Sequence, residues 1–259
     1  MNEFVLDVAG LSDRGVKRDH NEDAWSGPHP SLSREQLGKK GQLYVVADGV
    51  GGHQAGDVAS LMAVEIIQQQ YYADPSADVV TSLKTAIQSA NDQIVREATA
   101  RLARRGMSTT VTSAVVRDDQ LIVANVGDSR TYLIQNGQAR QLTDDHTWVE
   151  EQVRVGLISR TEAAKHPQRN IITRSLGSDR TLDIDIFETK LEPGDSILLC
   201  SDGLSNLISQ QEIGNIVSKG WMAEGAVNEL IELAIKRSAP DNVTAVLINI
   251  VRSKGDGLR

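Results

Sequence analysis

The sequence predicts an α+β fold in which helices cover the faces of antiparallel sheets. Amphipathic helical stripes occur in separate blocks of the chain, and the apolar strands between these blocks follow one another too closely for helical crossovers. The 259 residues are enough to bury a full core, and no Pro/Gly/Ser-rich linker or charge block divides them. We therefore expect a single domain over residues 1–252, followed by a short tail at 253–259.

Helical periodicity identifies three of the expected helices. Apolar residues at helical spacing run from Val58 to Ile66 and again from Val80 to Ala98, which predicts two consecutive amphipathic helices. A third stripe runs from Ala226 to Ala234, just before the last predicted strand. Each stripe gives its helix one apolar face, and we expect these faces to pack on sheets.

The strands between the helical blocks are expected to form hairpins. Turn signals such as Asp118-Asp119 and Asn136-Gly137 separate successive apolar runs. Connections this short require antiparallel neighbours. The predicted strands are 111–116, 121–126, 131–134, 139–142 and, near the end of the chain, 243–251.

Three apolar strands run directly into an aspartate beside a glycine, which is the most informative pattern in the chain. The residue pairs at these strand ends are Asp48-Gly49, Gly127-Asp128 and Asp202-Gly203. Further carboxylates where chain segments meet strands are Asp241 and the pair Glu22-Asp23. If these strand ends converge in space, they form a polyanionic pocket.

Such a pocket has the chemistry of a divalent metal site. Carboxylate oxygens and a glycine carbonyl are the ligands that Mg²⁺ or Mn²⁺ prefers, and glycine lets an ion approach the main chain. Because like charges repel one another unless cations lie between them, the cluster predicts a site for at least two divalent ions. For Asp48-Gly49 taken alone, a plain hairpin turn is an equal alternative, because Asp-Gly is also common turn chemistry.

Composition argues against several classes of protein. A net charge of −8 is opposite to the basic face that nucleic-acid binding needs, and the short basic run 101–105 is expected to be a solvated helix end. The single cysteine, Cys200, lies within an apolar strand and fits a reducing compartment. No signal peptide and no apolar stretch of about 18 to 20 residues is found, so we expect a cytosolic protein without membrane association.

The segment from Thr147 to Asn170 interrupts the succession of strands. It contains two short helical pieces, and His146 and His166 lie near its ends. The segment is expected to be either a lid over the carboxylates or a packed surface insertion. Both histidines are expected to be structural or lid residues, because an oxygen-rich pocket is already complete for a hard cation.

The order of the motifs resembles the metal-dependent PPM (type 2C) protein serine/threonine phosphatases, especially their compact bacterial members. The resemblance extends from Ala9 to Val251. Each motif is short, and it is their joint occurrence in order that is specific. The motifs are Gly15-Val-Lys-Arg-Asp-His-Asn-Glu-Asp23, Val46-Ala-Asp-Gly-Val-Gly-Gly-His53, Ser108-Thr-Thr110, Asn125-Val-Gly-Asp-Ser-Arg130, Leu142-Thr-Asp-Asp-His146, Ile172-Thr-Arg-Ser-Leu-Gly177, Ser201-Asp-Gly-Leu204 and Asp241-Asn-Val-Thr244.

This resemblance implies a four-layer α/β/β/α sandwich, with two central antiparallel sheets flanked by helix pairs. It also implies a metal-centred mechanism in which a water bridging two Mn²⁺ or Mg²⁺ ions attacks a phosphate monoester. By resemblance, Asp48 bridges both ions, and Asp202 and Asp241 complete the first. The Gly49 carbonyl and the Glu22-Asp23 pair serve the second ion, directly or through water. Asp128 resembles the aspartate that, with Asp202, forms a third and weaker site.

Three of the residues in these motifs have competing interpretations. Arg18 would bind the phosphate through paired N–H donors, whereas without the resemblance a solvated surface arginine is favoured. The alternative for Asp128 is an aspartate that closes a turn on nearby backbone N–H groups. In many eukaryotic members a histidine follows the Asp-Gly pair, but here that position is Val50 and the histidine is His53. His53 is expected to be a general acid, to orient a metal-bound water or to pack under the loop.

The leading functional hypothesis is a phosphoserine/phosphothreonine protein phosphatase that acts as a monomer and reverses a bacterial Ser/Thr kinase. A binding-only relative is disfavoured because every metal-ligand carboxylate is retained. A phosphatase of a partner-switching pathway is disfavoured because the chain has no room for a sensory domain. The acidic balance argues against a nuclease with a similar carboxylate cluster. The sequence does not distinguish Mn²⁺ from Mg²⁺, since both take octahedral oxygen ligands.

Overall fold

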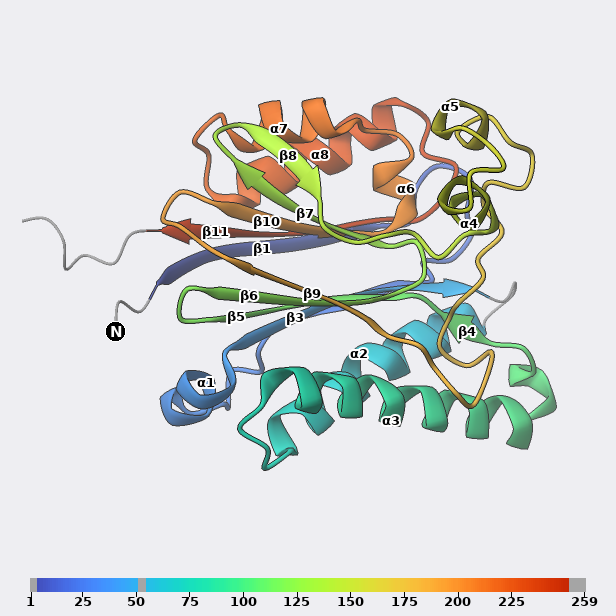
Figure 1. Ribbon diagram of the computed structural model, residues 1–259, viewed down its shortest axis with the longest axis horizontal. Coiled ribbons are helices and arrows are strands. Elements are labelled where there is room, and N and C mark those ends of the chain that lie inside the picture. The colour runs from blue at the N-terminus through green and yellow to red at the C-terminus, as the bar shows by residue number, and fades with distance from the viewer. Residues whose placement is uncertain (1–3, 51–54, 252–259) are drawn as a thin grey trace, which may run out of the picture.

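Two antiparallel sheets lie face to face at the centre of the molecule (Figure 1). The computed structural model describes residues 4–50 and 55–251. One sheet has the order β1-β11-β10-β7-β8, and the other has the order β2-β3-β5-β6-β9 with β4 paired to the end of β3. The strands are β1 (Val5–Asp13), β2 (Asp23–Ser26), β3 (Gln42–Val50), β4 (Ser108–Thr109), β5 (Val111–Arg117), β6 (Gln120–Val126), β7 (Arg130–Gln135), β8 (Gln138–Gln141), β9 (Asp185–Lys190), β10 (Ser196–Cys200) and β11 (Val243–Val251).

A pair of long helices covers the outer face of the β2-β3-β5-β6-β9 sheet, and a second pair covers the other sheet (Figure 1). The first pair is α2 (Gly56–Ala73) and α3 (Val79–Ala100), and the second is α7 (Gln210–Val217) and α8 (Ala223–Lys236). The remaining helices are α1 (Arg34–Lys40), the short 3₁₀ turn η1 (Leu102–Arg104), α4 (Trp148–Arg154), α5 (Arg160–Ala163) and α6 (Asp202–Ser205). The predicted four-layer α/β/β/α sandwich is therefore confirmed.

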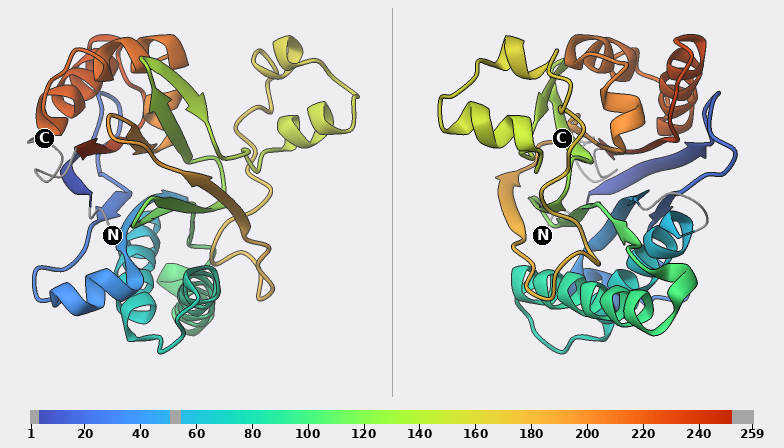
Figure 2. Two further views of the ribbon diagram at one scale, coloured as in Figure 1. Left: turned by 60° about the vertical axis from the view of Figure 1, so that its left-hand side comes forward. Right: turned by 90° about the vertical axis from the view of Figure 1, so that its right-hand side faces the viewer.

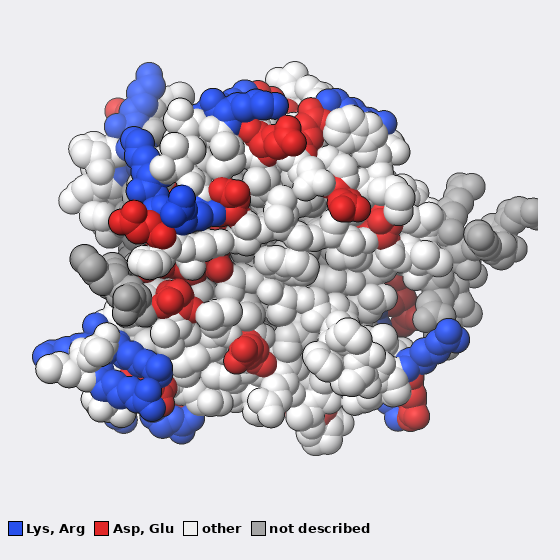
Figure 3. Space-filling model, turned by 180° about the vertical axis from the view of Figure 1, so that it is seen from behind, with Lys and Arg blue, Asp and Glu red and all other residues white. Residues whose placement is uncertain are grey.

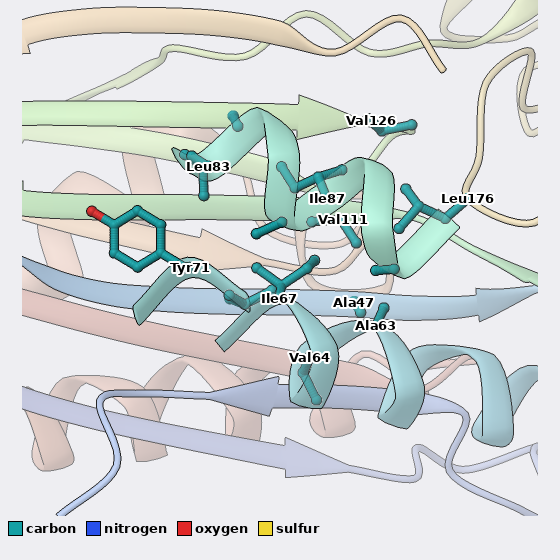
Figure 4. Packing of buried hydrophobic residues seen from close by; sticks show 14 of the residues in the cluster. Ala47, Ala63, Val64, Ile67, Tyr71, Leu83, Ile87, Val111, Val126 and Leu176 are labelled. Atoms are coloured by element: carbon teal, nitrogen blue, oxygen red, sulfur yellow. The ribbon is translucent and has the colours of Figure 1, made fainter. Parts of the chain in front are cut away.

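Three layers of apolar side chains hold the sandwich together. Figure 4 shows the layer between α2, α3 and their sheet, where Ile67 and Ile87 are fully buried. A second layer lies between the two sheets and includes Leu133 and Val246. The third lies under α7 and α8. Burying these side chains removes apolar surface from water at about 25 cal/mol per Å², which is the main term favouring the fold.

Most of the periodic elements agree with the sequence prediction, whereas several other elements were not predicted. The helices at 56–73, 79–100 and 223–236 are confirmed, as are the β5-β6 and β7-β8 hairpins. The expected β6-β7 hairpin is wrong, because these two strands belong to different sheets. The elements without a sequence prediction include the strands β1, β2, β4 and β9 and the helices α1, α6 and α7. Helices α1 and α7 begin with a capping box, Ser33 with Gln36 and Ser209 with Glu212, which is a local signal that the sequence does contain.

The sheet topology brings the carboxylate-bearing segments to one end of the sandwich. β3, β6 and β10 end there, and β2 and β11 begin there, on the right of Figure 1. The segment that carries α4 and α5 stands off from the same end as a separate flap over residues 147–170 (Figure 2). Within the residues described here, no helix has the length and apolar character needed to cross a bilayer.

Candidate active site

Asp23 joins the ends of the two sheets. It lies opposite Asp48 in the pairing of β2 with β3, so the first two carboxylates are fixed by strand register. Its Oδ2 accepts hydrogen bonds from Ser201 Oγ and Thr244 Oγ1, both at 2.7 Å, and these two residues belong to the opposite sheet. Its buried Oδ1 has no hydrogen-bond partner among the described residues. One oxygen of Asp23 is thus anchored while the other remains able to bind a ligand.

The main chain of Asp48 is held from both sides. Its N–H donates to Thr110 Oγ1 at 3.1 Å, and its carbonyl accepts from the Thr110 N–H at 2.9 Å and from Thr109 Oγ1 at 2.8 Å. β3 continues past Asp48 to Val50 because Gly49 pairs with Thr109. The hairpin-turn interpretation of Asp48-Gly49 is therefore wrong, since the pair lies within an extended strand.

Two glycines allow the backbone segments of the site to approach closely. A Cβ at Gly49 would lie 2.2 Å from the Gly56 carbonyl oxygen, at the start of α2. A Cβ at Gly203 would lie 2.0 Å from the Asn242 carbonyl oxygen. Real Cβ atoms do not come this close to a carbonyl oxygen, so each Asp-Gly pair combines a carboxylate side chain with a close main-chain approach.

Asp202 and Asp241 come from the neighbouring strands β10 and β11 of the other sheet. Asp202 is the first residue of α6, and Asn206 Nδ2 donates to its Oδ2 at 3.2 Å. Asp241 precedes β11, and its Oδ2 accepts from Arg18 Nη2 at 2.7 Å. Arg18 is a half-exposed residue held in the site by this ion pair, and the hydrogen bond to Asp241 is the main cause that raises its pKa.

Glu22 and Asp128 complete the set of predicted carboxylates. The Glu22 N–H donates to Asn242 Oδ1 at 2.8 Å, and its carboxyl group packs against Gly56, where a Cβ would lie 2.9 Å from the Glu22 Cδ. Asp128 Oδ1 is buried without a hydrogen-bond partner among the described residues. This unpartnered oxygen favours the ligand interpretation of Asp128 over an aspartate whose oxygens close a turn.

Burial and mutual repulsion raise the pKa of most of these carboxyl groups. Burial is the largest cause at each, and charged neighbours add to it. The pKa of Asp23 is raised to about 7, that of Asp128 to about 8 and that of Asp202 to about 6. Asp48 has a pKa well above its ordinary value, because burial and the surrounding aspartates disfavour its charge. A cation bound between these carboxyl groups would lower their pKa values, because it favours the charged form.

The donor set fits hard divalent cations. It consists of carboxylate oxygens with two buried, unpartnered Oδ1 atoms, at Asp23 and Asp128. In the described part of the chain, no three histidine, cysteine, aspartate or glutamate side chains already converge closely enough to enclose one ion. Side-chain rotation about the fixed main chain is therefore needed to bring three of them onto one ion.

A cleft of about 500 Å³ connects the carboxylates to the flap. Asp128, Asp202 and Asp241 line one side, and flap residues including Arg160 and Arg169 line the other. Acidic side chains gather at this end of the molecule between basic groups above and below, on the left of Figure 3. The cleft is wide enough for a side chain carrying a phosphate group, and the flap forms one of its walls.

The other predicted residues are placed as follows. His53 lies outside the described residues. His146 is buried beside the carboxylates, and His166 packs within the flap with its ring centroid 5.0 Å from that of Trp148. Cys200 is buried in β10, and burial raises the pKa of its thiol to about 12, which removes it as a nucleophile.

The structure adds residues that sequence reasoning did not single out. Asp23 is held by Ser201 and Thr244, and the Asp48 N–H is held by Thr110. These three residues lie inside the motifs, but each contact joins segments that are far apart in the sequence. Arg130 forms a bidentate ion pair with Asp145, with Nη2 at 2.6 Å and Nε at 2.9 Å from its oxygens. Both residues of this pair line the cleft.

The fold is a four-layer sandwich with a buried carboxylate centre at one end of its sheets and an arginine beside that centre. This combination is typical of a metal-dependent hydrolase. Comparison with known proteins identifies the family within this class. The sequence profile of the Protein phosphatase 2C family matches residues 11–155. The chain belongs to this family.

Relatives of known name support the same assignment. The chain is 39% identical over 242 residues to the serine/threonine phosphatase stp of Listeria welshimeri, which covers 92% of this chain and 93% of the relative. It superimposes on the crystal structure of the serine/threonine phosphatase Stp1 from Staphylococcus aureus with a TM-score of 0.87, at 35% identity and 95% coverage of each chain. The catalytic domain of the phosphatase PstP in complex with two manganese ions matches with a TM-score of 0.81 and 32% identity, covering 96% of this chain and all of that one.

Proposed function

We infer that this chain is a metal-dependent protein serine/threonine phosphatase that hydrolyses phosphoserine and phosphothreonine. The observation that carries this inference is the set of six carboxylates that the strand ends bring to one end of the sandwich beside Arg18, since Asp23 and Asp128 each keep a buried oxygen without a partner among the described residues. Family membership agrees with it. The buried Cys200 argues against a thiol-based phosphatase mechanism.

The ligand set that the geometry supports contains six carboxylates and one carbonyl. We propose that Asp48 contacts both of two ions, that Asp202 and Asp241 serve the first, and that Glu22, Asp23 and the Gly49 carbonyl serve the second. Asp128 and Asp202 together are a candidate for a third, weaker ion, which the unpartnered Oδ1 of Asp128 supports. When bound, the ions supply positive charge at the phosphate and lower the pKa of the attacking water.

The chain's own groups contribute binding and orientation. Arg18 would bind the phosphate of the substrate through its guanidinium N–H groups, a paired geometry that lysine lacks. Because its Nη2 already donates to Asp241, Arg18 is held next to the position that the phosphate must occupy. Ser201 and Thr244 fix one oxygen of Asp23, so that only the other is available to the centre. His53 is the nearest candidate in sequence for a proton donor to the leaving group.

The physiological setting is proposed from the family. The substrates are phosphorylated proteins, and the partner enzyme is a bacterial Ser/Thr kinase whose products this chain dephosphorylates. Mn²⁺ is the favoured ion because the related PstP structure holds two manganese ions, although an all-oxygen site also suits Mg²⁺. We further propose a cytoplasmic monomer in which residues 147–170 form a lid that selects protein substrates.

Hydrolysis of a phosphothreonine peptide tests this function. Purified protein is assayed with Mn²⁺, with EDTA, and as Asp202→Asn with Mn²⁺. Turnover in the first condition alone supports the proposal. Turnover that survives EDTA, or that Asp202→Asn retains in full, excludes a centre built on these carboxylates. Inactivity in all three conditions favours a binding role for the cleft.

A further inference from the structure

His146 forms hydrogen bonds through both nitrogens of its ring, although no catalytic role accounts for it. It precedes the flap and is only 5% exposed. The Gly127 N–H donates to its Nδ1 at 3.1 Å. Since a backbone N–H can only donate, Nδ1 must be the unprotonated nitrogen, and the ring proton is carried by Nε2. The Gly127 contact therefore fixes the tautomer, and Arg174 Nη1, which lies 3.4 Å from Nε2, donates to Asp185 Oδ1 at 3.0 Å instead.

On its other side the ring contacts the sheet that supports the flap. Nε2 lies 3.1 Å from Asp185 Oδ2, at the first residue of β9, and donates to it in this tautomer. Asp185 Oδ1 accepts from Arg174 Nη1 at 3.0 Å. Arg174 follows the flap in sequence, whereas His146 precedes it. Asp185 therefore binds the entry and the exit of the flap to one fixed strand end.

The two connecting segments of the flap also bind each other. The Thr173 N–H donates to the His146 carbonyl at 2.8 Å, and the Trp148 N–H donates to the Ile171 carbonyl at 2.9 Å. We call these two segments, 145–148 and 171–174, the stem of the flap. The stem residues Asp145 and Thr147 line the carboxylate cleft.

Gly127, the partner of the ring, carries the contact to the metal centre. The His146 N–H donates to the Gly127 carbonyl at 3.0 Å, so His146 binds both polar groups of the residue that precedes Asp128. Gly127 has a φ of +109°, and a Cβ there would lie 2.6 Å from Thr110 Cβ. Thr110 in turn accepts the Asp48 N–H. A continuous series of contacts thus runs from Asp185 through His146 and Gly127 to two aspartates of the centre.

We propose that His146 is a positioning residue that fixes the Gly127-Asp128 turn to the stem of the flap. The ring places Asp128 at the metal centre through Nδ1 and orients the flap over the cleft through Nε2 and Asp185. The consequences for turnover rest on the proposed function. The geometry of the Gly127-Asp128 turn does not depend on the proposed function, so the positioning role of His146 and the proposed function can be tested separately.

Two variants, each of which replaces one of the two ring nitrogens by a similar polar group, separate the two contacts of the ring. His146→Asn keeps an acceptor at the place of Nδ1 and loses the bond to Asp185, whereas His146→Gln keeps a donor near Nε2 and loses the bond to Gly127. Hydrogen exchange at the Gly127 amide should accelerate by at least about 5-fold in His146→Gln, because a buried N–H is left without an acceptor. The same amide should stay protected in His146→Asn. Weakening of Mn²⁺ binding by about 10-fold should accompany only the His146→Gln change.

Asp185→Asn tests the contact to the flap, and Asp183→Asn is its matched control. Asp183 also contacts Arg174, at 3.4 Å, but it is exposed and does not touch His146. Asp185→Asn should raise KM for a phosphopeptide by about 3- to 10-fold while leaving kcat for an aryl phosphate within about 2-fold, as expected for a positioning effect. Asp183→Asn should change neither quantity.

The decisive readout is the tautomer of His146, which a long-range ¹H–¹⁵N spectrum reports without any turnover. A proton on Nε2 alone, with faster Gly127 exchange in His146→Gln, supports the positioning role even if the protein hydrolyses nothing. A proton on Nδ1, or unchanged Gly127 exchange in His146→Gln, overturns it even if the protein is an active phosphatase.

Discussion

The carboxylate centre and the flap lie on opposite sides of one cleft, but they are held in different ways. At the centre, strand register and the Thr109 and Thr110 hydroxyl groups fix the main chain of Asp48, and two 2.7 Å bonds fix the Asp23 carboxylate. The flap has two short helices and joins the sandwich through its stem, where a single carboxylate, Asp185, binds both connecting segments. The main chain of the centre therefore has a fixed geometry. We expect substitutions within the flap to leave that geometry unchanged.

The largest expected effect is the loss of the centre itself. Asp202→Asn should reduce kcat/KM by at least about 100-fold with any phosphate ester, because it removes a ligand charge that stabilises the transition state. The fold should survive, since Asp202 follows β10 and lines the cleft. Circular dichroism and thermal melting serve as the controls, and near-normal turnover in a folded variant would contradict the role of Asp202.

A second expected effect concerns the pH dependence of stability in EDTA. The folded-state pKa values of Asp23, Asp202 and Asp128 are raised to about 7, 6 and 8 from an ordinary value of 3.8, so the folded protein binds more protons than the unfolded chain. This contribution is fully present below about pH 4 and is lost as pH rises through 6 to 8. The unfolding free energy should fall by up to about 1.4 kcal/mol per pH unit for each carboxyl that remains protonated.

Denaturant melts from about pH 5 to about pH 8 measure this slope. Asp128→Asn should make it shallower, because one of the titrating groups is gone. Saturating Mn²⁺ should reduce or reverse it, since ions bind the deprotonated groups. Stability in EDTA that stays constant or rises over this range would show that the carboxyl groups are not held together as described.

The elements predicted from sequence are those whose signals are local. An apolar run that ends in an aspartate beside a glycine is readable within about ten residues, so Asp48, Asp128 and Asp202 could be picked out from the sequence alone as candidates. The partners of His146 are 19 and 39 residues away in sequence, at Gly127 and Asp185, and no local pattern links them. The extended conformation of Asp48-Gly49 also depends on a distant partner, the Thr109 of β4.

Thr244→Val sharpens the comparison because it removes one hydrogen bond to Asp23 without replacing any of the proposed metal ligands. Among the described residues, Asp23 Oδ2 would then keep Ser201 as its single donor, and the loss should weaken Mn²⁺ binding by about 10-fold. Ser12 Oγ lies 2.7 Å from Thr244 Oγ1 and loses the same partner, so Ser12→Ala is the matched control. Titration calorimetry measures both variants, and equal affinities in wild type and Thr244→Val would show that the anchor is dispensable.

The smallest effect on chemistry is expected from exchange of the flap. Replacing residues 147–170 by the corresponding segment of a relative should change kcat/KM among phosphoprotein substrates by about 10-fold, which is about 1.4 kcal/mol of differential binding. Hydrolysis of a small aryl phosphate should stay within about 2-fold, because the segment contributes no carboxylate to the centre. Equal changes with both kinds of substrate would remove the flap as a selectivity element.

The central claim is that the strand-end carboxylates form one metal centre organised around Asp48. Titration calorimetry of Mn²⁺ into the wild type and into folded Asp48→Asn tests it most directly, because it needs no substrate. The account predicts two tightly bound ions in the wild type and loss of both in the variant, since one aspartate serves both ions. Unchanged stoichiometry and affinity in Asp48→Asn would contradict it.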